Sequence, residues 1–203
     1  MIVIIDYGIG NLSSVLNMFR KVGVEEVCIS GEHETIRKAS KILLPGVGAF
    51  DRGMENLESK GLVPILNQKA LTEKVPVLGI CLGMQLLSRS SEEGRKQGLG
   101  WIDAKTIKFN PDPSLGLRIP HMGWDYVTVK RKNPLLREEA RHRFYFVHSY
   151  HVVCDSDEQS IGTTDFGGPF TCMVNKENIY GTQFHPEKSL KFGMELLSNF
   201  AKL

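Results

Sequence analysis

Gly79-Ile80-Cys81-Leu82-Gly83 is the stretch that decides the fold of this chain. An apolar run precedes it at residues 75–78, and a run with helical spacing follows it at residues 84–87. A strand that turns abruptly into a helix, with a reactive atom at the turn, is a nucleophile elbow, and small residues flank the nucleophile because the turn is tight. We expect Cys81 at the N-terminus of a helix, whose dipole favours the thiolate. The alternative is a buried strand cysteine between ordinary turn glycines.

The composition excludes several classes of function. The 203 residues are 41% hydrophobic and 24% charged with a net charge of +2, which predicts one domain over residues 1–203 and no nucleic-acid partner. No apolar run approaches the ~20 residues of a membrane span, so we expect no membrane partner. The first six residues show no basic n-region or cleavage site, which predicts a first strand and a cytoplasmic location. The four cysteines lack C-x-x-C spacing, so no metal site is expected.

Strands and helices alternate through the first half of the chain. Strands are expected at residues 2–5, 26–30, 41–44 and 75–80, and helices at residues 12–22, 32–38, 51–72 and 82–90. Asn11 is placed to cap the first helix. This alternation predicts a parallel α/β sheet, in which sites lie at the carboxyl ends of the strands. The loops at 6–11, 45–50 and 79–83 should therefore converge on one crevice.

The second half of the chain is rich in strands. They are expected at residues 106–109, 126–130, 144–153, 160–164, 170–174 and 179–184, and turns such as Gly167-Gly168 predict antiparallel pairing. His142 lies among arginines and is expected on the surface. Apolar side chains share one face of residues 189–203, which predicts a closing helix.

A second candidate for chemistry is Phe184-His185-Pro186-Glu187. Pro186 favours an extended conformation at His185, and residues i and i+2 of an extended chain point to the same side. Glu187 can then reach one ring nitrogen of His185, provided that the chain stays extended past the proline. A carboxylate there fixes the tautomer and leaves the other nitrogen free for a nucleophile. The alternative is a surface turn without chemistry.

A thiolate–imidazolium pair also needs donors for a developing oxyanion. The elbow supplies one donor, the backbone N–H of Leu82. The loop Pro45-Gly46-Val47-Gly48 could supply the other, because its two glycines let backbone N–H groups turn toward a ligand. The alternative for this loop is a plain strand-to-helix turn.

Together, the three motifs resemble the class I (triad) glutamine amidotransferases. The segments at residues 6–11, 120–124, 145–150 and 188–189 are similar to one branch of them, the glutaminase subunit of imidazole glycerol phosphate synthase. This resemblance covers essentially the whole chain. It implies a three-layer α/β fold with a central mixed, mainly parallel sheet flanked by helices and an antiparallel, strand-rich second half.

The resemblance also implies the reaction and its residues. Cys81 attacks the side-chain amide of L-glutamine, His185 transfers protons and Glu187 orients His185, so that ammonia leaves and water hydrolyses a thioester to glutamate. Leu82, Val47 and Gly48 belong to the oxyanion site. The residues implied to hold the substrate are Gly46, Gln85, His148 and Ser149. No cofactor is implied.

The implied partner is a (β/α)₈-barrel synthase subunit. The chain would form a heterodimer with this cyclase, deliver ammonia to it for imidazole glycerol phosphate formation in histidine biosynthesis, and be activated by it. The positions implied to lie at the subunit interface are Asn11, Pro120, Met122, Trp124, Tyr145 and Lys188.

Two positions depart from that branch. Asp125 stands where it usually has Asn, and Ala104 stands where it commonly has glycine. Residues 98–105 and 185–194 also look like a paralogue that supplies ammonia to a sugar amidotransferase in bacterial surface-polysaccharide biosynthesis. Two further alternatives are a scaffold subunit that lost the reaction, which the intact triad disfavours, and a cysteine peptidase or γ-glutamyl hydrolase, which Gln85 disfavours.

Overall fold

One central sheet organises the molecule. The computed structural model describes residues 1–203, and its sheet has the order β2-β1-β3-β4-β11-β10-β9-β6-β7, with β8 paired to β10 and β5 to β8. The strands are β1 (Ile2–Ile5), β2 (Val27–Ser30), β3 (Lys41–Gly46), β4 (Val77–Cys81), β5 (Ala104–Lys108), β6 (His121–Val129), β7 (His142–His148), β8 (Tyr150–Cys154), β9 (Ser160–Asp165), β10 (Pro169–Lys176) and β11 (Ile179–Thr182).

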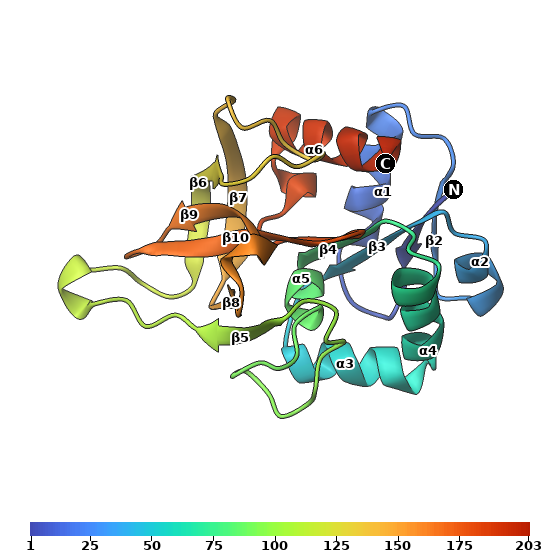
Figure 1. Cartoon of the computed structure of the whole chain (residues 1–203), viewed down its shortest axis with the longest axis horizontal. Helices are drawn as coiled ribbons and strands as arrows, with labels where there is room; N and C mark the ends of the chain where they lie inside the picture. Colours follow the sequence, from blue (N-terminus) through green and yellow to red (C-terminus); the bar gives the residue numbers. More distant parts are fainter.

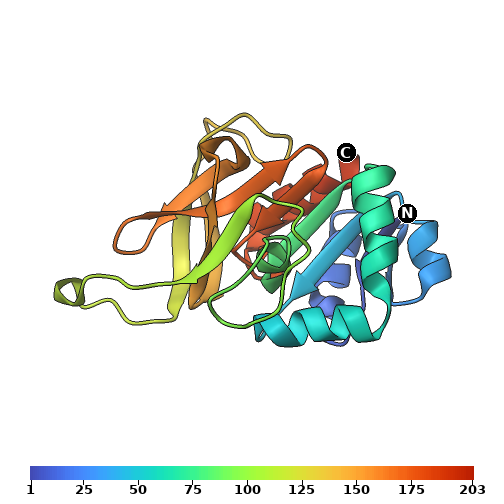
Figure 2. The same ribbon diagram turned by 60° about the horizontal axis from the view of Figure 1, so that its bottom comes forward.

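Helices cover the parallel part of the sheet on both faces (Figures 1 and 2). They are α1 (Leu12–Lys21), α2 (His33–Arg37), α3 (Phe50–Ser59), α4 (Leu62–Asn67), which continues into a π-helical turn at Gln68–Thr72, α5 (Leu82–Leu86) and α6 (Leu190–Lys202). Asn11 caps α1 by accepting a hydrogen bond from the Ser14 amide. None of these helices is long and apolar enough to cross a membrane.

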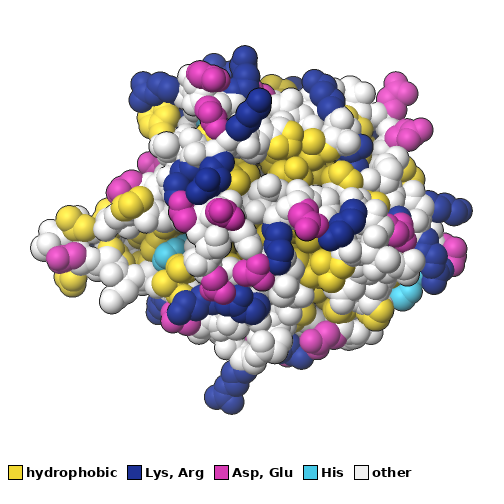
Figure 3. Space-filling view, in the orientation of Figure 1, with side chains coloured by type: hydrophobic (Ala, Val, Ile, Leu, Met, Phe, Trp, Pro, Cys, Tyr) yellow, Lys and Arg dark blue, Asp and Glu magenta, His cyan; other side chains and the backbone are white.

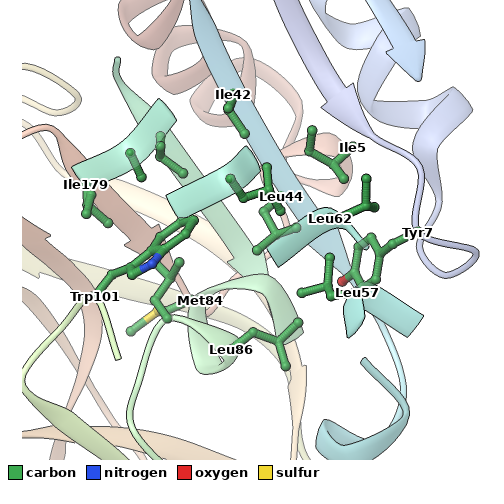
Figure 4. Packing of buried hydrophobic residues seen from close by; sticks show 14 of the residues in the cluster. Ile5, Tyr7, Ile42, Leu44, Leu57, Leu62, Met84, Leu86, Trp101 and Ile179 are labelled. Atoms are coloured by element: carbon green, nitrogen blue, oxygen red, sulfur yellow. The ribbon is translucent and has the colours of Figure 1, made fainter. Parts of the chain in front are cut away.

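Alternate residues of the parallel strands pack into two separate hydrophobic cores. Ile2 and Ile4 of β1 point to the face covered by α1 and α6, where they pack in one cluster with Phe19 and Phe200. Val3 and Ile5 point to the other face, in the cluster that α3, α4 and α5 complete. Figure 4 shows this second cluster, with side chains from several elements meeting between sheet and helices. Burial on both faces explains why these strands are continuous apolar runs, and the expected three-layer α/β fold is confirmed.

β11 brings the end of the chain beside its middle. It runs parallel to β4, with Thr182 opposite Ile80, and antiparallel to β10. On its other side β4 pairs with β3, so that Gly46 lies opposite Cys81. The carboxyl ends of β3, β4 and β11 therefore meet at one edge, as expected for binding sites in parallel sheets.

The antiparallel half departs from the sequence expectations in detail. β6 begins at His121 rather than at residue 126, and the expected strand at 144–153 is two strands, β7 and β8, separated at Ser149. The expectation that His142 lies on the surface is wrong: its side chain is buried, and Nε2 lies 2.8 Å from the carbonyl oxygen of Arg137.

An arm of residues 109–120 projects from the body between β5 and β6 (Figures 1 and 2). It exposes apolar side chains, visible at the left of Figure 3, namely Leu115, Leu117 and Ile119. Charged side chains of both signs are interspersed over the rest of that face, which fits the small net charge.

Candidate active site

Cys81 occupies a strained turn between β4 and α5. Its backbone has φ 55° and ψ −110°, a region that residues with a side chain rarely adopt. Residues in such conformations cluster at active sites, where the surrounding structure holds them in place. The strand-to-helix elbow expected from the sequence is present, and it places the thiol at the start of α5.

Glycines on either side of Cys81 make this turn possible. A Cβ on Gly79 would lie 2.7 Å from the carbonyl oxygen of Gly83, and a Cβ on Gly83 would overlap the carbonyl oxygen of Leu44. Backbone atoms cannot move aside without displacing the strand. Both positions therefore require glycine for close backbone approach, as the tightness of the turn predicts.

His185 and Glu187 form a buried pair, although the chain between them is not extended as expected. His185 itself is extended, but Pro186–Lys188 is a 3₁₀ turn. Glu187 Oε1 still lies 2.7 Å from His185 Nδ1, and both side chains are almost wholly buried. The His185 amide donates to the carbonyl of Tyr145 at 2.9 Å, which ties this segment to β7.

The surroundings of His185 favour its protonated form. Burial opposes the charge on the ring, but the interactions with Cys81 and Glu187 outweigh it and raise the pKa of His185 to about 10. Nε2 is buried and has no hydrogen-bond partner. This nitrogen is thus available to a group bound in the pocket, while Nδ1 is held by the carboxylate.

A pocket of about 480 Å³ opens at this edge of the sheet. Residues 185 and 81, which are 104 positions apart, both line it. The full lining comprises Val47, Gly48, Ala49, Cys81, Leu82, Gln85, Glu93, Pro120, Val147, His148, Ser149, Tyr150 and His185. Of the positions expected to contact substrate or oxyanion, only Gly46 is absent from this lining.

Gly46 lies beneath the pocket rather than on its surface. It is buried, and a Cβ there would overlap the hydroxyl of Tyr7. That hydroxyl donates to the carbonyl of Pro45 at 2.8 Å, so Tyr7 supports the loop from below. Burial raises the pKa of Tyr7, with a further contribution from Cys81, so its hydroxyl remains a donor. Gly48 has φ 106°, where a side chain would be strained.

Gln183 is a polar residue of the site that the sequence reasoning missed. It is fully buried, and its Nε2 lies 3.8 Å from Cys81 Sγ. Its Oε1 accepts a hydrogen bond from Gln85 Nε2 at 3.1 Å, and the same amide donates to the carbonyl of Tyr150 at 3.1 Å. Two amides thus connect the pocket wall to the thiol. The sequence offered one signal for it: Gln183 lies two positions before His185, and residues i and i+2 of an extended chain point to the same side.

Glu93 is the second omission. It lines the pocket and is its only carboxylate, and Oε2 accepts a hydrogen bond from the Phe50 amide at 2.9 Å. A carboxylate fixed there offers a partner for a cationic group of a ligand. Its place on an irregular polar loop gave no periodic pattern by which to find it.

His148 forms part of the pocket wall, and its ring is neutral. Burial lowers the pKa of His148 to about 3, although the hydrogen bond to Tyr150 opposes this shift. Its Nδ1 lies 2.7 Å from the carbonyl oxygen of Tyr150. Ser149 follows it at the break between β7 and β8 and also faces the pocket.

Of the residues expected at a subunit interface, Pro120 lines the pocket, and the others are exposed or half-buried. Trp124 and Tyr145 are paired across β6 and β7, and the ammonium of Lys188 lies 5.5 Å from the centre of the Tyr145 ring. Met122 is 61% exposed, and Pro120 both is exposed and lines the pocket. Asn11 is exposed at the start of α1.

This arrangement is suited to acyl transfer. It joins a strained thiol, a histidine that holds a proton, a carboxylate behind that histidine, and backbone donors at the start of a helix.

The sequence comparisons agree over the whole chain. The model of the glutamine amidotransferase class-I family matches residues 3–203. The chain is 55% identical to imidazole glycerol phosphate synthase subunit HisH 2 of Methanococcus maripaludis, covering 100% of this chain and 99% of that protein. It is 48% identical to the HisH subunit of Leptospira interrogans and 46% identical to HisH 2 of Pseudomonas aeruginosa, each with full coverage of both chains.

Solved structures of low sequence identity share the fold. A crystal structure of a glutamine amidotransferase has a TM-score of 0.75 at 16% identity, covering 98% of this chain and 97% of that one. The structure of PurLQS from Thermotoga maritima also has a TM-score of 0.75 at 16% identity, covering 99% of this chain and 97% of that one.

Proposed function

Because this chain belongs to the class-I glutamine amidotransferase family, we propose that it is the glutaminase subunit of an imidazole glycerol phosphate synthase. It hydrolyses L-glutamine to glutamate and ammonia, and the ammonia serves histidine biosynthesis. Its four free cysteines fit the reducing cytoplasm. One observation supports the reaction above all: Cys81 and His185 line one pocket, while Glu187 holds the far nitrogen of His185.

The first half of the reaction forms a thioester. The thiolate of Cys81 attacks the amide carbon of glutamine, and the carbonyl oxygen takes up negative charge. The amide of Leu82 and the loop at Val47 and Gly48 donate to that oxygen. The carbon–nitrogen bond then breaks, and the nitrogen leaves as ammonia with the proton from His185 Nε2. A γ-glutamyl group remains bonded to Cys81.

The second half releases glutamate. His185, now neutral, takes a proton from water as the water oxygen attacks the thioester carbon. The carbon–sulfur bond breaks and restores the thiolate, and His185 holds the proton again. Glu187 favours the protonated ring in both halves, because its carboxylate accepts from Nδ1.

The pocket also accounts for recognition of the amino acid. We assign Glu93 to the α-ammonium group of glutamine, because it is the carboxylate of the lining. Gln85, His148 and Ser149 surround the rest of the substrate. Gly46 contributes from below, by allowing Tyr7 to approach the loop.

The names of the relatives describe a subunit, so we propose a heterodimer with a (β/α)₈-barrel cyclase. The exposed residues near the pocket mouth support a docking face there. Trp124 and Tyr145 are half-buried aromatic residues, a type enriched at the centre of interfaces, and exposed Lys188 lies over the Tyr145 ring. Ammonia would then pass from the pocket into the barrel without entering bulk water.

Replacing the Cys81 thiol tests whether Cys81 is the nucleophile of the glutaminase reaction. In the complex with the barrel subunit, Cys81→Ser should reduce glutamine-dependent synthase activity by about a thousandfold or more. Activity with free ammonia should be retained, because the barrel's own reaction does not need the thiol. Cys28→Ser is the matched control, since Cys28 lies on β2 outside the pocket. Retained glutaminase activity in Cys81→Ser would contradict the mechanism.

A second candidate changes only the acceptor of the ammonia. Asp125 and Ala104, which depart from the branch that the sequence resembles, favour a paralogue that serves a sugar amidotransferase. Assays of the two barrel partners separate the candidates: the cognate barrel should stimulate glutaminase activity, and the other should not.

A further inference from the structure

A line of three hydrogen bonds runs from Asp125 to the pocket wall. Asp125 Oδ2 lies 2.7 Å from Nε2 of His121, and Nδ1 of His121 lies 3.0 Å from Nε2 of His148. Nδ1 of His148 lies 2.7 Å from the carbonyl oxygen of Tyr150. That carbonyl also accepts from Gln85, whose amide leads through Gln183 to the sulfur of Cys81. Asp125 is thereby connected to the nucleophile through side chains alone, apart from one carbonyl.

Counting donors along this line fixes the direction of its hydrogen bonds. A carbonyl oxygen can only accept, so the proton of neutral His148 is on Nδ1 and its Nε2 is an acceptor. His121 must then donate from Nδ1 to His148. The carboxylate of Asp125 contacts the other nitrogen of the same ring, so His121 is held between His148 and Asp125.

Asp125 is the polar partner that reaches His121 from the surface. The side chain of His121 is only 3% exposed, whereas that of Asp125 is 45% exposed. A buried polar ring needs hydrogen-bond partners, and Asp125 is the one at Nε2. The rings packed against His121 are those of neutral His148 and of four phenylalanines, Phe109, Phe146, Phe166 and Phe170.

The backbone of β6 departs from regular strand geometry between these two side chains. On a straight strand, Cα atoms four residues apart are about 13 Å from each other, too far for the side chains of His121 and Asp125 to meet. Gly123 lies midway with φ 140°, where other residues are strained, and a Cβ there would meet no atom within 4 Å. Glycine is needed at this position for its conformation rather than for space.

We infer that Asp125 is a positioning residue of the glutaminase site, which holds the His121 ring by a hydrogen bond and so fixes His148 and the Tyr150 carbonyl in the pocket wall. This inference rests on the proposed function. Losing Asp125 would leave His121 free to turn, and the acceptor on His148 would lose its fixed donor. The wall would then hold glutamine less precisely.

The Asp125→Asn variant preserves the line of hydrogen bonds and removes only the charge, because the amide of Asn can donate to Nε2 of His121 or accept from it. Asp165→Asn, at an exposed carboxylate on β9, is the matched control.

Kinetics of the complex with the barrel subunit test the positioning. Asp125→Ala should lower kcat/KM for glutamine about tenfold, the loss expected for one charge-assisted hydrogen bond. Asp125→Asn should stay within about threefold of the wild type, a rescue that a purely electrostatic effect would not produce. Unchanged kcat/KM in Asp125→Ala would refute the role of Asp125. A wild-type complex without glutaminase activity would refute the proposed function instead.

Discussion

Glu187 raises the proton affinity of His185, the residue that protonates the leaving ammonia in the proposed mechanism. Its carboxylate is one of the two groups that raise the pKa of His185 to about 10 against the opposing effect of burial. At neutral pH His185 is therefore protonated, and it loses this proton only as the pH rises through about 10. Any change that removes the carboxylate should move that loss to lower pH.

The Glu187→Gln variant tests the direction in which the carboxylate shifts the pKa of His185. The amide cannot match the negative charge, so the pKa of His185 falls, and the alkaline limb of the pH profile of kcat/KM shifts to lower pH in the complex. Activity at neutral pH should fall about tenfold or more, because general acid catalysis contributes ~10²–10⁴-fold. Glu158→Gln, at an exposed glutamate, is the control and should leave the profile unchanged. An unshifted limb in Glu187→Gln would show that the carboxylate does not govern this proton.

Gln183 should matter for the nucleophile although it does not line the pocket. Gln183→Met keeps a side chain of similar length and removes the donor to Cys81 and the acceptor for Gln85. Because hydrogen bonds to charged groups contribute about 1.5–3 kcal/mol, kcat/KM should fall about 10- to 100-fold. Stopped glutaminase assays on the complex measure this, with Gln68→Met on the surface as control. Equal activity of both variants would exclude a role for Gln183.

Single residues show where sequence reasoning succeeds and where it ends. The two glycines around Cys81 were predictable, because steric rules for a tight turn are local. Glu187 was expected to contact His185 through an extended chain, and it does so through a 3₁₀ turn instead. His142 was misplaced because its charged neighbours belong to the exposed side of β7, while His142 points inward. Which side faces the core depends on pairing with β6, and no local pattern specifies that.

At the scale of elements, α6 holds the catalytic turn in place. Its Gly193 approaches so closely that a Cβ there would overlap the carbonyl oxygen of Pro186. The helix is amphipathic and was predicted from its spacing, yet the reason for a glycine in its middle is visible only from the neighbouring turn.

Gly193→Ala should therefore displace the segment that contains His185 and Glu187. We expect the free energy of unfolding to fall by about 1–3 kcal/mol, the usual loss on overpacking, and kcat/KM to fall at least tenfold. Denaturant titration and glutaminase assays measure the two effects. Ser198→Ala on the same helix should change stability by less than about 0.5 kcal/mol. A Gly193→Ala variant with full activity would show that α6 does not position the turn.

Strand boundaries were predicted less well in the antiparallel half than in the parallel half. The runs of β1, β3 and β4 are mainly apolar, and their predicted limits agree with the structure to within two residues. By contrast, residues 142–154 form one run of strand-forming residues, which the structure divides between β7 and β8 because these pair with different neighbours. Choice of partner is a tertiary effect that overrides local preference.

For the whole molecule, the decisive step is the insertion of β11 between β4 and β10. The sequence predicted a strand at each of these three places but did not indicate which strands would be adjacent. Because β11 pairs with β4 in parallel, the turn after it lies beside the elbow, and the two halves of the site meet. Because the parallel strands have similar burial patterns, several strand orders in the sheet are possible. The observed strand order could therefore not be derived from the sequence alone.

At the scale of the whole molecule, Lys188 is exposed in the same 3₁₀ turn as Glu187, where the proposed barrel partner would meet it. Lys188→Ala removes a cation from the Tyr145 ring at the surface. We expect the unfolding free energy to change by less than about 0.5 kcal/mol, while stimulation of glutaminase activity by the barrel should fall severalfold. Lys191→Ala, which removes a cation over Phe192 three residues away, is the matched control. An unchanged stimulation ratio with a lowered unfolding free energy would assign Lys188 to the fold rather than to docking.

The distribution of thiols favours covalent labelling of Cys81 over Cys154 and Cys172. Cys81 lines the open pocket, whereas Cys172 is fully buried and its pKa is raised by burial, and burial together with nearby aspartates raises the pKa of Cys154 to about 11. A small electrophile shaped like glutamine would therefore modify Cys81 ahead of these two thiols. A fluorophore carried on that reagent would lie near Pro120 at the pocket mouth, where its emission would report the arrival of a second subunit in real time.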